Sequence, residues 1–364
     1  MAPKYQDAEI GLLKEEVKRQ HHHDTKHSWH TAAVALFSFV LLLGVIFAFL
    51  HADSLNPAPE DHPLDGLKLD KGSMNVLIIG DWGRKGQYNQ SFVARQMGRV
   101  GKELDVDFIV SAGDNFYKTG LKDVEDDNFD LSFTDVYTAE SLQKRWYAVL
   151  GNHDYKGDER AQVDKRLQQK DTRWFCDYFY TIPVSVGPSS TVEFFMIDTT
   201  PMVEKYWTFP ESLKYSWRRP IPREEVVAST LANLNSALEK SSATWKIVIG
   251  HHTIYSFGYH GDTQEVVEKV LPILKDNKVD LYINGHDHCL EHVKRDDSDI
   301  HFVTTGGGSR SWNGKFAKDV QARSEAKLYY DGDGFISLSA SPSSVLINFF
   351  DITGQVLHKF KLEK

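Results

Sequence analysis

The chain alternates short apolar runs with polar stretches, and six of the runs have the length and the β-branched or aromatic character of buried strands. The six runs are Val76–Ile79, Phe108–Val110, Trp146–Leu150, Phe194–Ile197, Ile247–Ile249 and Leu281–Ile283. Gly or another small residue follows most of these runs, and an Asp, Asn or His comes directly after it. The pattern predicts a sheet whose strand ends carry a set of polar side chains.

Three segments between the apolar runs have the spacing of amphipathic helices. The first follows Asn89-Gln90-Ser91, the second follows Pro222, and the third begins near Thr263. The positions expected on their buried faces are Val93, Met97, Val100 and Leu104 in the first, Val227, Leu231, Leu234 and Leu238 in the second, and Val266, Val270 and Leu274 in the third. Near the C-terminus, Val345–Phe350 and Val356–Phe360 predict a β-hairpin.

Residues 74–364 are therefore expected to form one α/β domain, and three segments are expected before it. Residues 1–31 are polar and include several histidines, which is typical of a solvated tail. Residues 32–50 are apolar and uncharged, and a helix of this length nearly matches a hydrocarbon core of about 30 Å, which predicts a transmembrane signal anchor. Residues 51–73 contain Pro and several acids and are expected to be a linker.

The charges around residues 32–50 predict the orientation of this anchor. Several basic residues precede it and only Lys68 falls in the twenty residues after it, so the tail should face the cytosol and the domain should be lumenal or extracellular. The alternative is a cleaved signal peptide, which would give a soluble secreted protein.

The polar residues at the strand ends are the candidate chemistry, because open α/β sheets bind ligands outside the carboxyl ends of their strands. One Asp after a strand is usually a helix cap or a turn residue, but five such positions carry Asp, Asn or His. Oxygen and imidazole donors of this kind suit hard or borderline divalent and trivalent metals. The candidate ligands are Asp81, Asp114, Tyr117, Asn152, His251, His286 and His288.

Two of these residues predict the kind of metal centre. Asp114 has two carboxylate oxygens and is suited to bridge two metals that lie a few ångströms apart. Tyr117 binds a metal only if the metal displaces the phenol proton, and a trivalent ion does this better than zinc does. The pair therefore indicates a dinuclear centre with ferric iron at one position.

Composition adds exclusions and open questions. A formal net charge of −9 over 364 residues argues against a nucleic-acid partner. The two cysteines, Cys176 and Cys289, are too few for a disulfide framework, and either one disulfide between them or a buried free thiol is compatible with the sequence. Asn89 begins a glycosylation sequon or caps a helix. The long aromatic and Pro-rich loop between Asp198 and Pro222 is typical of a binding lid.

Five ordered motifs carry a resemblance to a known family. The motifs are Gly80-Asp81-Trp82-Gly83, Gly113-Asp114-Asn115-Phe116-Tyr117, Gly151-Asn152-His153-Asp154, Gly250-His251 and Gly285-His286-Asp287-His288. They resemble the metallophosphoesterase signature in its purple acid phosphatase form, and further motifs are similar to the low-molecular-weight plant type. Many metallophosphoesterases have His where this chain has Gly83, and Tyr117 appears in its place. The resemblance implies a four-layer α/β/β/α sandwich.

The resemblance also implies roles for single residues. Ferric iron would be held by Asp81, Asp114, Tyr117 and His288, and a divalent iron, zinc or manganese by Asp114, Asn152, His251 and His286. His153 and His260 match the two substrate-facing histidines of the family, and a structural, hydrogen-bonded histidine is the alternative for each. His252 is not counted as a ligand, and Asp154 and Asp198 are expected to orient neighbours or cap helices.

The implied reaction is hydrolysis of phosphate monoesters with an acidic pH optimum, by a metal-activated hydroxide at the Fe(III)–M(II) centre. Protonated His153 and His260 would hold the phosphate and protonate the leaving alcohol. Three alternatives remain: a phosphodiesterase or a phosphoprotein phosphatase on the same scaffold, and an inactive membrane-anchored binding protein. A redox-cycling divalent iron would add a peroxidase-like side reaction. The sequence does not predict the oligomeric state.

Overall fold

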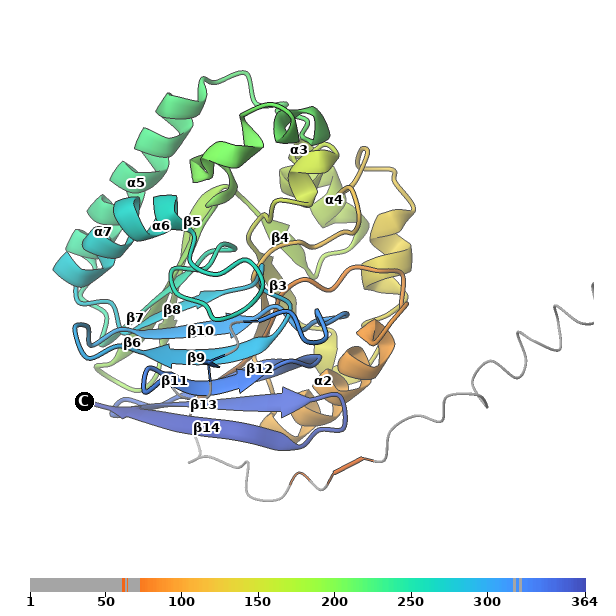
Figure 1. The fold of residues 1–364 in the computed structure, drawn as a ribbon. Coiled ribbons are helices and arrows are strands. Elements are labelled where there is room, and N and C mark those ends of the chain that lie inside the picture. The colour runs from red at the N-terminus through yellow and green to blue at the C-terminus, as the bar shows by residue number, and fades with distance from the viewer. Residues whose placement is uncertain (1–60, 63, 65–72, 317–318, 321–322) are drawn as a thin grey trace, which may run out of the picture. The chain divides into compact units, whose positions relative to one another are not determined.

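The computed structural model describes residues 61–62, 64, 73–316, 319–320 and 323–364 (Figure 1). All of them belong to one compact unit, Glu60–Lys364. The predicted tail, the predicted anchor and most of the predicted linker lie outside the described residues. No helix among the described residues is both long enough and apolar enough to cross a membrane. Two linker residues contact the domain: Asp61 pairs with Arg95 at 2.9 Å, and His62 N donates to Thr353 O at 2.9 Å.

Fourteen strands in the described part of the chain form two seven-stranded sheets. The first sheet has the spatial order β14 (Val356–Glu363), β13 (Ser344–Asp351), β12 (Gly334–Ala340), β1 (Met74–Ile79), β2 (Phe108–Ser111), β3 (Arg145–Ala148) and β4 (Trp174–Cys176). The second sheet has the order β11 (Ala326–Tyr330), β9 (Leu290–Lys294), β10 (His301–Thr305), β8 (Leu281–Asn284), β7 (Trp245–Ile249), β6 (Thr191–Ile197) and β5 (Phe179–Ser185). Five of the six apolar runs lie wholly in strands, as predicted, and the run Trp146–Leu150 extends two residues past the end of β3 at Ala148.

Helices cover the outer face of each sheet. The helices are α2 (Gln90–Leu104), α3 (Arg160–Val163), α4 (Lys165–Lys170), α5 (Arg223–Lys240), α6 (Gln264–Lys269) and α7 (Leu271–Asp276). Short turns of π-helix (η1, Asp130–Thr134) and of 3₁₀-helix (η2, Glu140–Leu142; η3, Asp154–Lys156; η4, Thr200–Met202; η5, Glu204–Tyr206; η6, Glu211–Lys214) fill the connections. Figure 1 shows α5, α6 and α7 on the side of the second sheet and α2, α3 and α4 on the side of the first.

Three buried cores show that the domain has four layers. One core joins the facing sides of the two sheets and includes Val76 and Ile78 of β1 with Ile247 of β7. The second lies between the first sheet and α2, and the third lies between the second sheet and α5, α6 and α7. Because each sheet buries both faces, its central strands are apolar on both sides, which explains the unbroken apolar runs. The predicted α/β/β/α sandwich is confirmed.

The helical predictions agree with the structure except at two points. Val93, Met97, Val100 and Leu104 are all buried in α2. In α5 the buried stripe is Val226, Thr230, Leu234 and Leu238, so the prediction for Val227 and Leu231 was wrong by one position; these two side chains are only partly buried. The third predicted helix is divided at Val270 into α6 and α7, because Pro272 lacks the N–H that would continue the ladder.

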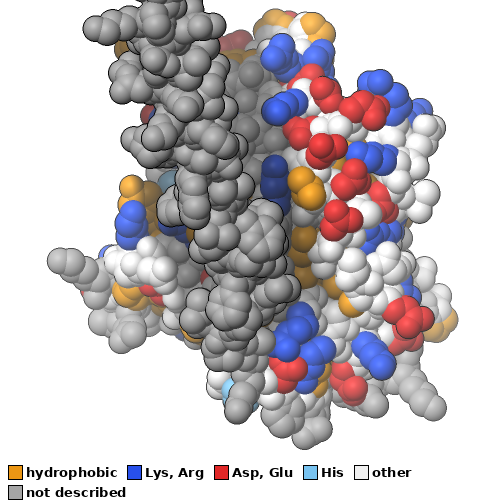
Figure 2. All heavy atoms as spheres, turned by 90° about the vertical axis from the view of Figure 1, so that its right-hand side faces the viewer, with side chains coloured by type: hydrophobic (Ala, Val, Ile, Leu, Met, Phe, Trp, Pro, Cys, Tyr) orange, Lys and Arg blue, Asp and Glu red, His pale blue; other side chains and the backbone are white. Residues whose placement is uncertain are grey.

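The outer surface carries charges of both signs. Figure 2 shows acidic and basic side chains intermingled on the face that includes α4. Several of them form ion pairs, such as Lys170–Asp130 at 2.7 Å and Arg166–Asp164 at 2.9 Å. Pairs of this kind lie in water and each contributes at most about 1 kcal/mol to stability.

Candidate metal centre

The predicted ligands lie at the carboxyl ends of three strands of the first sheet and two strands of the second. Strands β1, β2 and β3 are parallel neighbours in the first sheet, and β6, β7 and β8 are parallel neighbours in the second. Asp81, Asp114 and Asn152 follow β1, β2 and β3, whereas His251 and His286 follow β7 and β8. Parallel strands end at the same edge of a sheet, so the two sheets bring both groups together.

Tyr117 lies at the centre of the first ligand group. Its hydroxyl oxygen is 2.8 Å from Asp81 Oδ1, 2.8 Å from Asp114 Oδ2 and 2.9 Å from His288 Nε2. His288 Nε2 is also 3.3 Å from Asp81 Oδ1. A hydroxyl has one proton and cannot satisfy two carboxylates, whereas an octahedral cation with bonds of about 2.1 Å has neighbouring donor atoms about 3 Å apart. The four side chains fit one cation.

The second group gathers around His251. Its Nδ1–H donates to Ala112 O at 2.9 Å, which leaves Nε2 without a proton and available to a metal. Nε2 lies 3.4 Å from Asp114 Oδ1 and 3.3 Å from Asn152 Oδ1. The His286 ring packs against His251 with a centroid distance of 5.2 Å. Asp114 thus presents Oδ2 to the first group and Oδ1 to the second, as a bridging carboxylate would.

His252 adjoins His251 and His286, and the three have nitrogen atoms close enough together to share an ion. Both ring nitrogens of His252 already have hydroxyl partners, however. Nδ1 lies 2.8 Å from Thr199 Oγ1 and Nε2 lies 2.9 Å from Tyr206 Oη. The expectation that His252 is not a ligand therefore agrees with its hydrogen bonds.

Backbone strain accompanies the metal-ligand positions. Asp81, Asp114 and His286 all have positive φ angles, of 62°, 51° and 71°. Residues other than glycine in this region cost of order 1–3 kcal/mol each, and such strain is concentrated at functional sites. The neighbouring Gly285 is required by close approach, because a Cβ there would lie 2.3 Å from Asp81 Oδ2.

Gly83 shows why this chain departs from the pattern with His at that position. A Cβ on Gly83 would lie 1.9 Å from Asn115 O, so the position has no room for a side chain. Its carbonyl accepts a hydrogen bond from Tyr117 N at 2.8 Å. The loop after β2 therefore closes directly over Gly83, and the phenol of Tyr117 reaches Asp81 from that loop.

The electrostatics of the two carboxylates also favour a cation. Burial raises the pKa of Asp81 to about 8, since the charged form has lost its water. Burial acts in the same direction on Asp114, but the imidazoles of His251 and His153 outweigh it and hold the pKa of Asp114 below its usual range. Two buried carboxyl groups this close share negative charge that a bound metal would neutralise.

Asp154 and Asp198 are buried, and their carboxylates accept hydrogen bonds from other protein groups. Asp154 accepts from Gly151 N at 2.8 Å and from Asn115 N at 3.1 Å, so it aligns the loops after β3 and β2. Asp198 accepts from Tyr155 Oη and from Thr200 N. Both residues orient neighbours, as expected.

His153 lies at the rim of the centre, and its backbone and ring both form hydrogen bonds there. Its backbone N donates to Asp114 Oδ1 at 2.7 Å. The ring donates through Nδ1 to Lys118 O, and Nε2 lies 3.1 Å from Lys156 Nζ, which can donate to it. Burial lowers the pKa of His153 to about 4, and Lys156 acts in the same direction. Burial and Lys156 thus act against the protonated His153 that the sequence predicts, whereas the neighbouring Asp114 raises the pKa of the ring and acts in its favour.

His260 reaches the centre from the loop after β7. Its ring stacks on His286 with a centroid distance of 4.2 Å and its outer face is exposed. Its backbone N donates to Asp287 Oδ1 at 2.8 Å, and Ser256 Oγ donates to Asp287 Oδ2 at 2.6 Å. Asp287, which lies between two predicted ligands, thus fastens the loop that carries His260.

Sequence reasoning missed four residues that contact this centre. Arg84 lies over the ring of Tyr117, Trp312 stacks on His288 with centroids 4.3 Å apart, Lys156 contacts His153, and Tyr215 Oη lies 3.5 Å from Asn152 Nδ2. Lys156 had a local signal, because it follows His153 by three residues and contacts that same residue. Arg84 follows Asp81 by three residues, but the ring that it contacts belongs to Tyr117 in another loop. Trp312 and Tyr215 come from loops whose sequence shows no such spacing.

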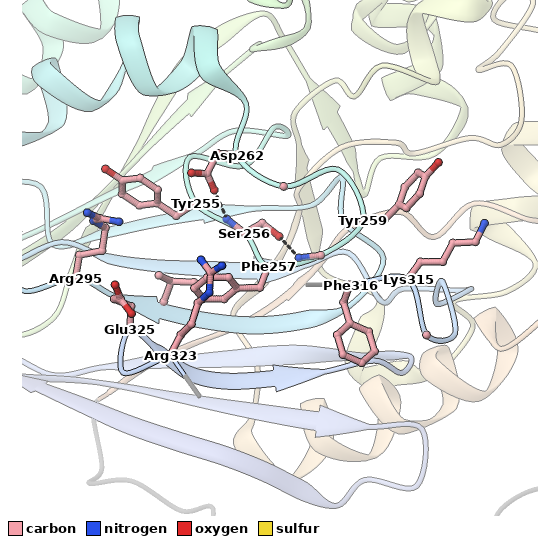
Figure 3. Close-up of a pocket in the computed structure, with 14 residues that line it drawn as sticks. Tyr255, Ser256, Phe257, Tyr259, Asp262, Arg295, Lys315, Phe316, Arg323 and Glu325 are labelled. Carbon is pink, nitrogen blue, oxygen red and sulfur yellow. Dashed lines mark hydrogen bonds between the residues drawn. The ribbon is translucent and has the colours of Figure 1, made fainter. Parts of the chain in front are cut away.

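A cavity of about 660 Å³ lies beside the loop that carries His260 (Figure 3). Tyr255, Phe257 and Tyr259 line it from that loop, and Arg295 and Arg323 line it from the opposite wall. Figure 3 shows Tyr255 and Arg295 at one end and Tyr259 at the other. None of the predicted site residues lines this cavity, so it adjoins the centre and is separate from it.

Two open questions of the sequence concern Cys176, Cys289 and Asn89. Both cysteines are buried and free, so the disulfide is not formed. Asn89 occupies the N-cap position of α2 but its side chain makes no capping bond, and its Nδ2 donates to Asp333 instead. The helix-cap role is therefore not what its side chain performs.

Comparisons with known proteins agree with this geometry. Residues 74–290 match the calcineurin-like phosphoesterase family. Purple acid phosphatase 7 of Arabidopsis thaliana is 49% identical over 90% of this chain and 97% of its own length. Purple acid phosphatase 3 of the same plant is 50% identical over 80% of this chain and 78% of its own length.

A solved structure has a similar fold. The structure described as GAP50, the anchor in the inner membrane complex of Plasmodium, matches with a TM-score of 0.69 and 27% identity. The match covers 80% of this chain and 89% of that one. Together with the plant relatives and the convergent ligand groups, these matches show that the chain belongs to the purple acid phosphatases, metal-dependent enzymes with a dinuclear Fe(III)–M(II) centre that hydrolyse phosphate monoesters.

Proposed function

We propose that the two ligand groups divide the metals as the resemblance implies. Ferric iron belongs to the group around Tyr117, with Asp81, Asp114 and His288. The divalent ion belongs to the group around His251, with Asp114, Asn152 and His286. The observation that carries this proposal is the position of Asp114, whose Oδ2 faces Tyr117 at 2.8 Å and whose Oδ1 faces His251 at 3.4 Å.

When bound, the two metals supply Lewis acidity and a water made nucleophilic at acidic pH. The protein side chains position the substrate and move a proton. His153 contacts the ring of Tyr117 in the first ligand group and has its Nε2 3.1 Å from Lys156 Nζ, and His260 stacks on His286 of the second group. In this arrangement Lys156 Nζ supplies a proton to His153 Nε2, and His153 Nε2–H passes it to the oxygen of the leaving alcohol.

The donors of the second ligand group favour three divalent metals equally. Imidazole nitrogen, amide oxygen and carboxylate suit zinc, manganese and divalent iron alike. Metal analysis and the visible spectrum of the purified protein test the assignment. We expect a purple protein with both sites filled. A colourless active protein with two zinc or manganese ions would remove the ferric assignment and keep the phosphatase.

Monoester specificity is the second part of the proposal, because the same scaffold could serve a phosphodiesterase or a phosphoprotein phosphatase. The loop after β6 supports the monoester. Its Trp207 and Trp217 rings stack with centroids 3.5 Å apart, and its Tyr215 reaches Asn152. This packed loop narrows access to the divalent position. Equal rates on a monoester, a diester and a phosphoprotein would contradict it.

We further propose that residues 32–50 anchor the protein in a membrane and place the domain in the lumen or outside the cell. The support is the length of the uncharged apolar segment and the basic residues before it. Extraction of membranes with alkaline carbonate, and protease treatment of intact vesicles, test this. Release of the protein by carbonate would favour the cleaved, secreted alternative. A mobility shift that depends on Asn89 would show whether the sequon is used.

An inactive membrane-anchored binding protein is the competing function, and its support is that a similar structure with 27% identity is described as an anchor. The presence and convergence of all seven proposed ligands argue for catalysis. The metal analysis described above distinguishes the two functions. Bound iron in the purified protein supports the phosphatase, and absence of iron supports the inactive anchor, since a decayed site would not retain iron.

A further inference from the structure

Arg84 is a buried cation beside the centre that the proposed roles do not use. Its side chain is 9 % exposed, and its Nε donates to Ser309 Oγ at 3.0 Å. Within the described part of the chain, no carboxylate forms an ion pair with it. A guanidinium buried without an anionic partner is costly, so its partner should be sought among the groups that it touches.

The group that Arg84 touches is the phenol of Tyr117. The guanidinium carbon lies 3.5 Å from the centroid of the Tyr117 ring, within the range of a cation–π contact. Arginine suits this position because its planar guanidinium stacks on aromatic faces. The contact becomes stronger when the phenol carries negative charge, as it does when it binds a ferric ion.

A second link joins Arg84 to another proposed ligand. Ser309, which accepts from Arg84 Nε, donates through its Oγ to the carbonyl of Asp81 at 2.6 Å. Asp81 is one of the residues with positive φ. Arg84 therefore braces the backbone of Asp81 and the ring of Tyr117 at the same time.

We propose that Arg84 is a positioning residue that holds the Tyr117 ring in place and stabilises the electrons of the iron-bound phenolate. This inference rests on the proposed ferric site. It assigns to Arg84 control over the energy of the tyrosinate-to-iron charge transfer and over the reduction potential of the iron.

The direction of both effects follows from distance. The guanidinium lies over the ring, whereas the iron would bind at the phenol oxygen on the ring's edge. The positive charge therefore stabilises the electron donor more than the acceptor. Removing it raises the donor level and moves the absorption band to longer wavelength. Removing a cation near the iron also favours the ferric state, which lowers the reduction potential.

The test compares neutral variants in the metal-loaded full-length protein. Arg84→Gln and Arg84→Met both remove the charge, and Met also keeps an apolar stem against the ring, so either variant that folds is informative. Arg310→Gln is the matched control, because Arg310 is exposed and lies over Tyr88, with 4.7 Å between guanidinium carbon and ring centroid. The readouts are the visible spectrum and the potential at which the colour changes.

We expect the Arg84 variants to move the band to longer wavelength and to lower the reduction potential, because both lose the cation–π contact with the phenolate. The Arg310 variant should leave both unchanged. The proposal is overturned if the Arg84 variants have the same spectrum as the wild type. It is also overturned if Arg310→Gln shifts the band as much as the two Arg84 variants do. If the wild-type protein is colourless but still hydrolyses monoesters, the proposed role of Arg84 is wrong and the phosphatase activity stands. If the wild-type protein is purple but inactive, the proposed phosphatase function is wrong and the role of Arg84 stands.

Discussion

The phenol oxygen of Tyr117 lies 2.8 Å from Oδ2 of Asp114, three residues earlier in the chain. The loop after β2 thus supplies both the carboxylate shared by the two ligand groups and the phenol that belongs to only one of them. This difference between the groups makes the two metal positions chemically unequal, and each of the first two predictions depends on it.

Replacing Tyr117 by Phe should abolish the purple colour, because the charge-transfer donor is lost while the ring remains in place. The absorption spectrum of the iron-loaded protein measures this. Tyr215→Phe is the control, since Tyr215 Oη lies near Asn152 at 3.5 Å and is not a proposed ligand. An unchanged band in Tyr117→Phe would mean that another residue is the donor.

Replacing the two aspartates should separate the metal positions. Asp81→Asn should lose more iron than divalent ion, because Asp81 Oδ1 faces Tyr117 and His288, whereas its Oδ2 accepts a hydrogen bond from His286 N. Asp114→Asn should lose both, because its two oxygens face different groups. Metal content per folded chain, after dialysis against a chelator, measures the difference. Equal losses in the two variants would argue against a bridging Asp114.

If His153 and His260 protonate the leaving alcohol, the loss of kcat in their variants should depend on the leaving group of the substrate. Loss of a residue that protonates the leaving alcohol should slow an alkyl phosphate by about 10²-fold or more, whereas an aryl phosphate with an acidic phenol needs little protonation. We expect this split in kcat for His153→Ala. A similar split for His260→Ala would give it the same role, and equal losses on both substrates would reduce it to holding phosphate.

A cluster of three histidines outside the metal centre should make the folded protein less stable in acid. His292 in β9 is 2 % exposed and lies 2.9 Å from His301 Nδ1 and 3.0 Å from His358 Nε2. Burial lowers the pKa of His292 to about 2, and Lys327 and Lys294 act in the same direction. The folded pKa lies below the unfolded value of about 6.5, so stability is complete above pH 6.5 and falls as the pH decreases.

Between pH 6.5 and 5 His292 alone should cost about 1.5 kcal/mol of the free energy of unfolding. Urea unfolding of the metal-loaded protein at both pH values measures this cost. His292→Asn should lose less stability over the interval than the wild type, and the exposed His62→Asn should match the wild type. An acid loss in His292→Asn as large as that of the wild type would contradict the prediction.

The sequence by itself determined the strands and the residues at their ends. Apolar runs bounded by small residues are local signals, so Asp81, Asp114, Asn152, His251 and His286 could be placed at strand ends without any knowledge of the tertiary structure. Parallel strands end at one edge, which made the convergence of these side chains predictable as well. The amphipathic face of α2 was predictable for the same local reason.

Only the tertiary structure decided which groups support those ligands. Arg84 meets Ser309 across 225 positions of the chain, and Trp312 stacks on His288 from a loop without a periodic pattern. The hydrogen bonds of the His153 ring come from Lys118 and Lys156, which pack around it. Such contacts arise where loops of two stacked sheets meet. Local periodicity reports which face of a strand or helix is buried, but not which distant loop will cover it.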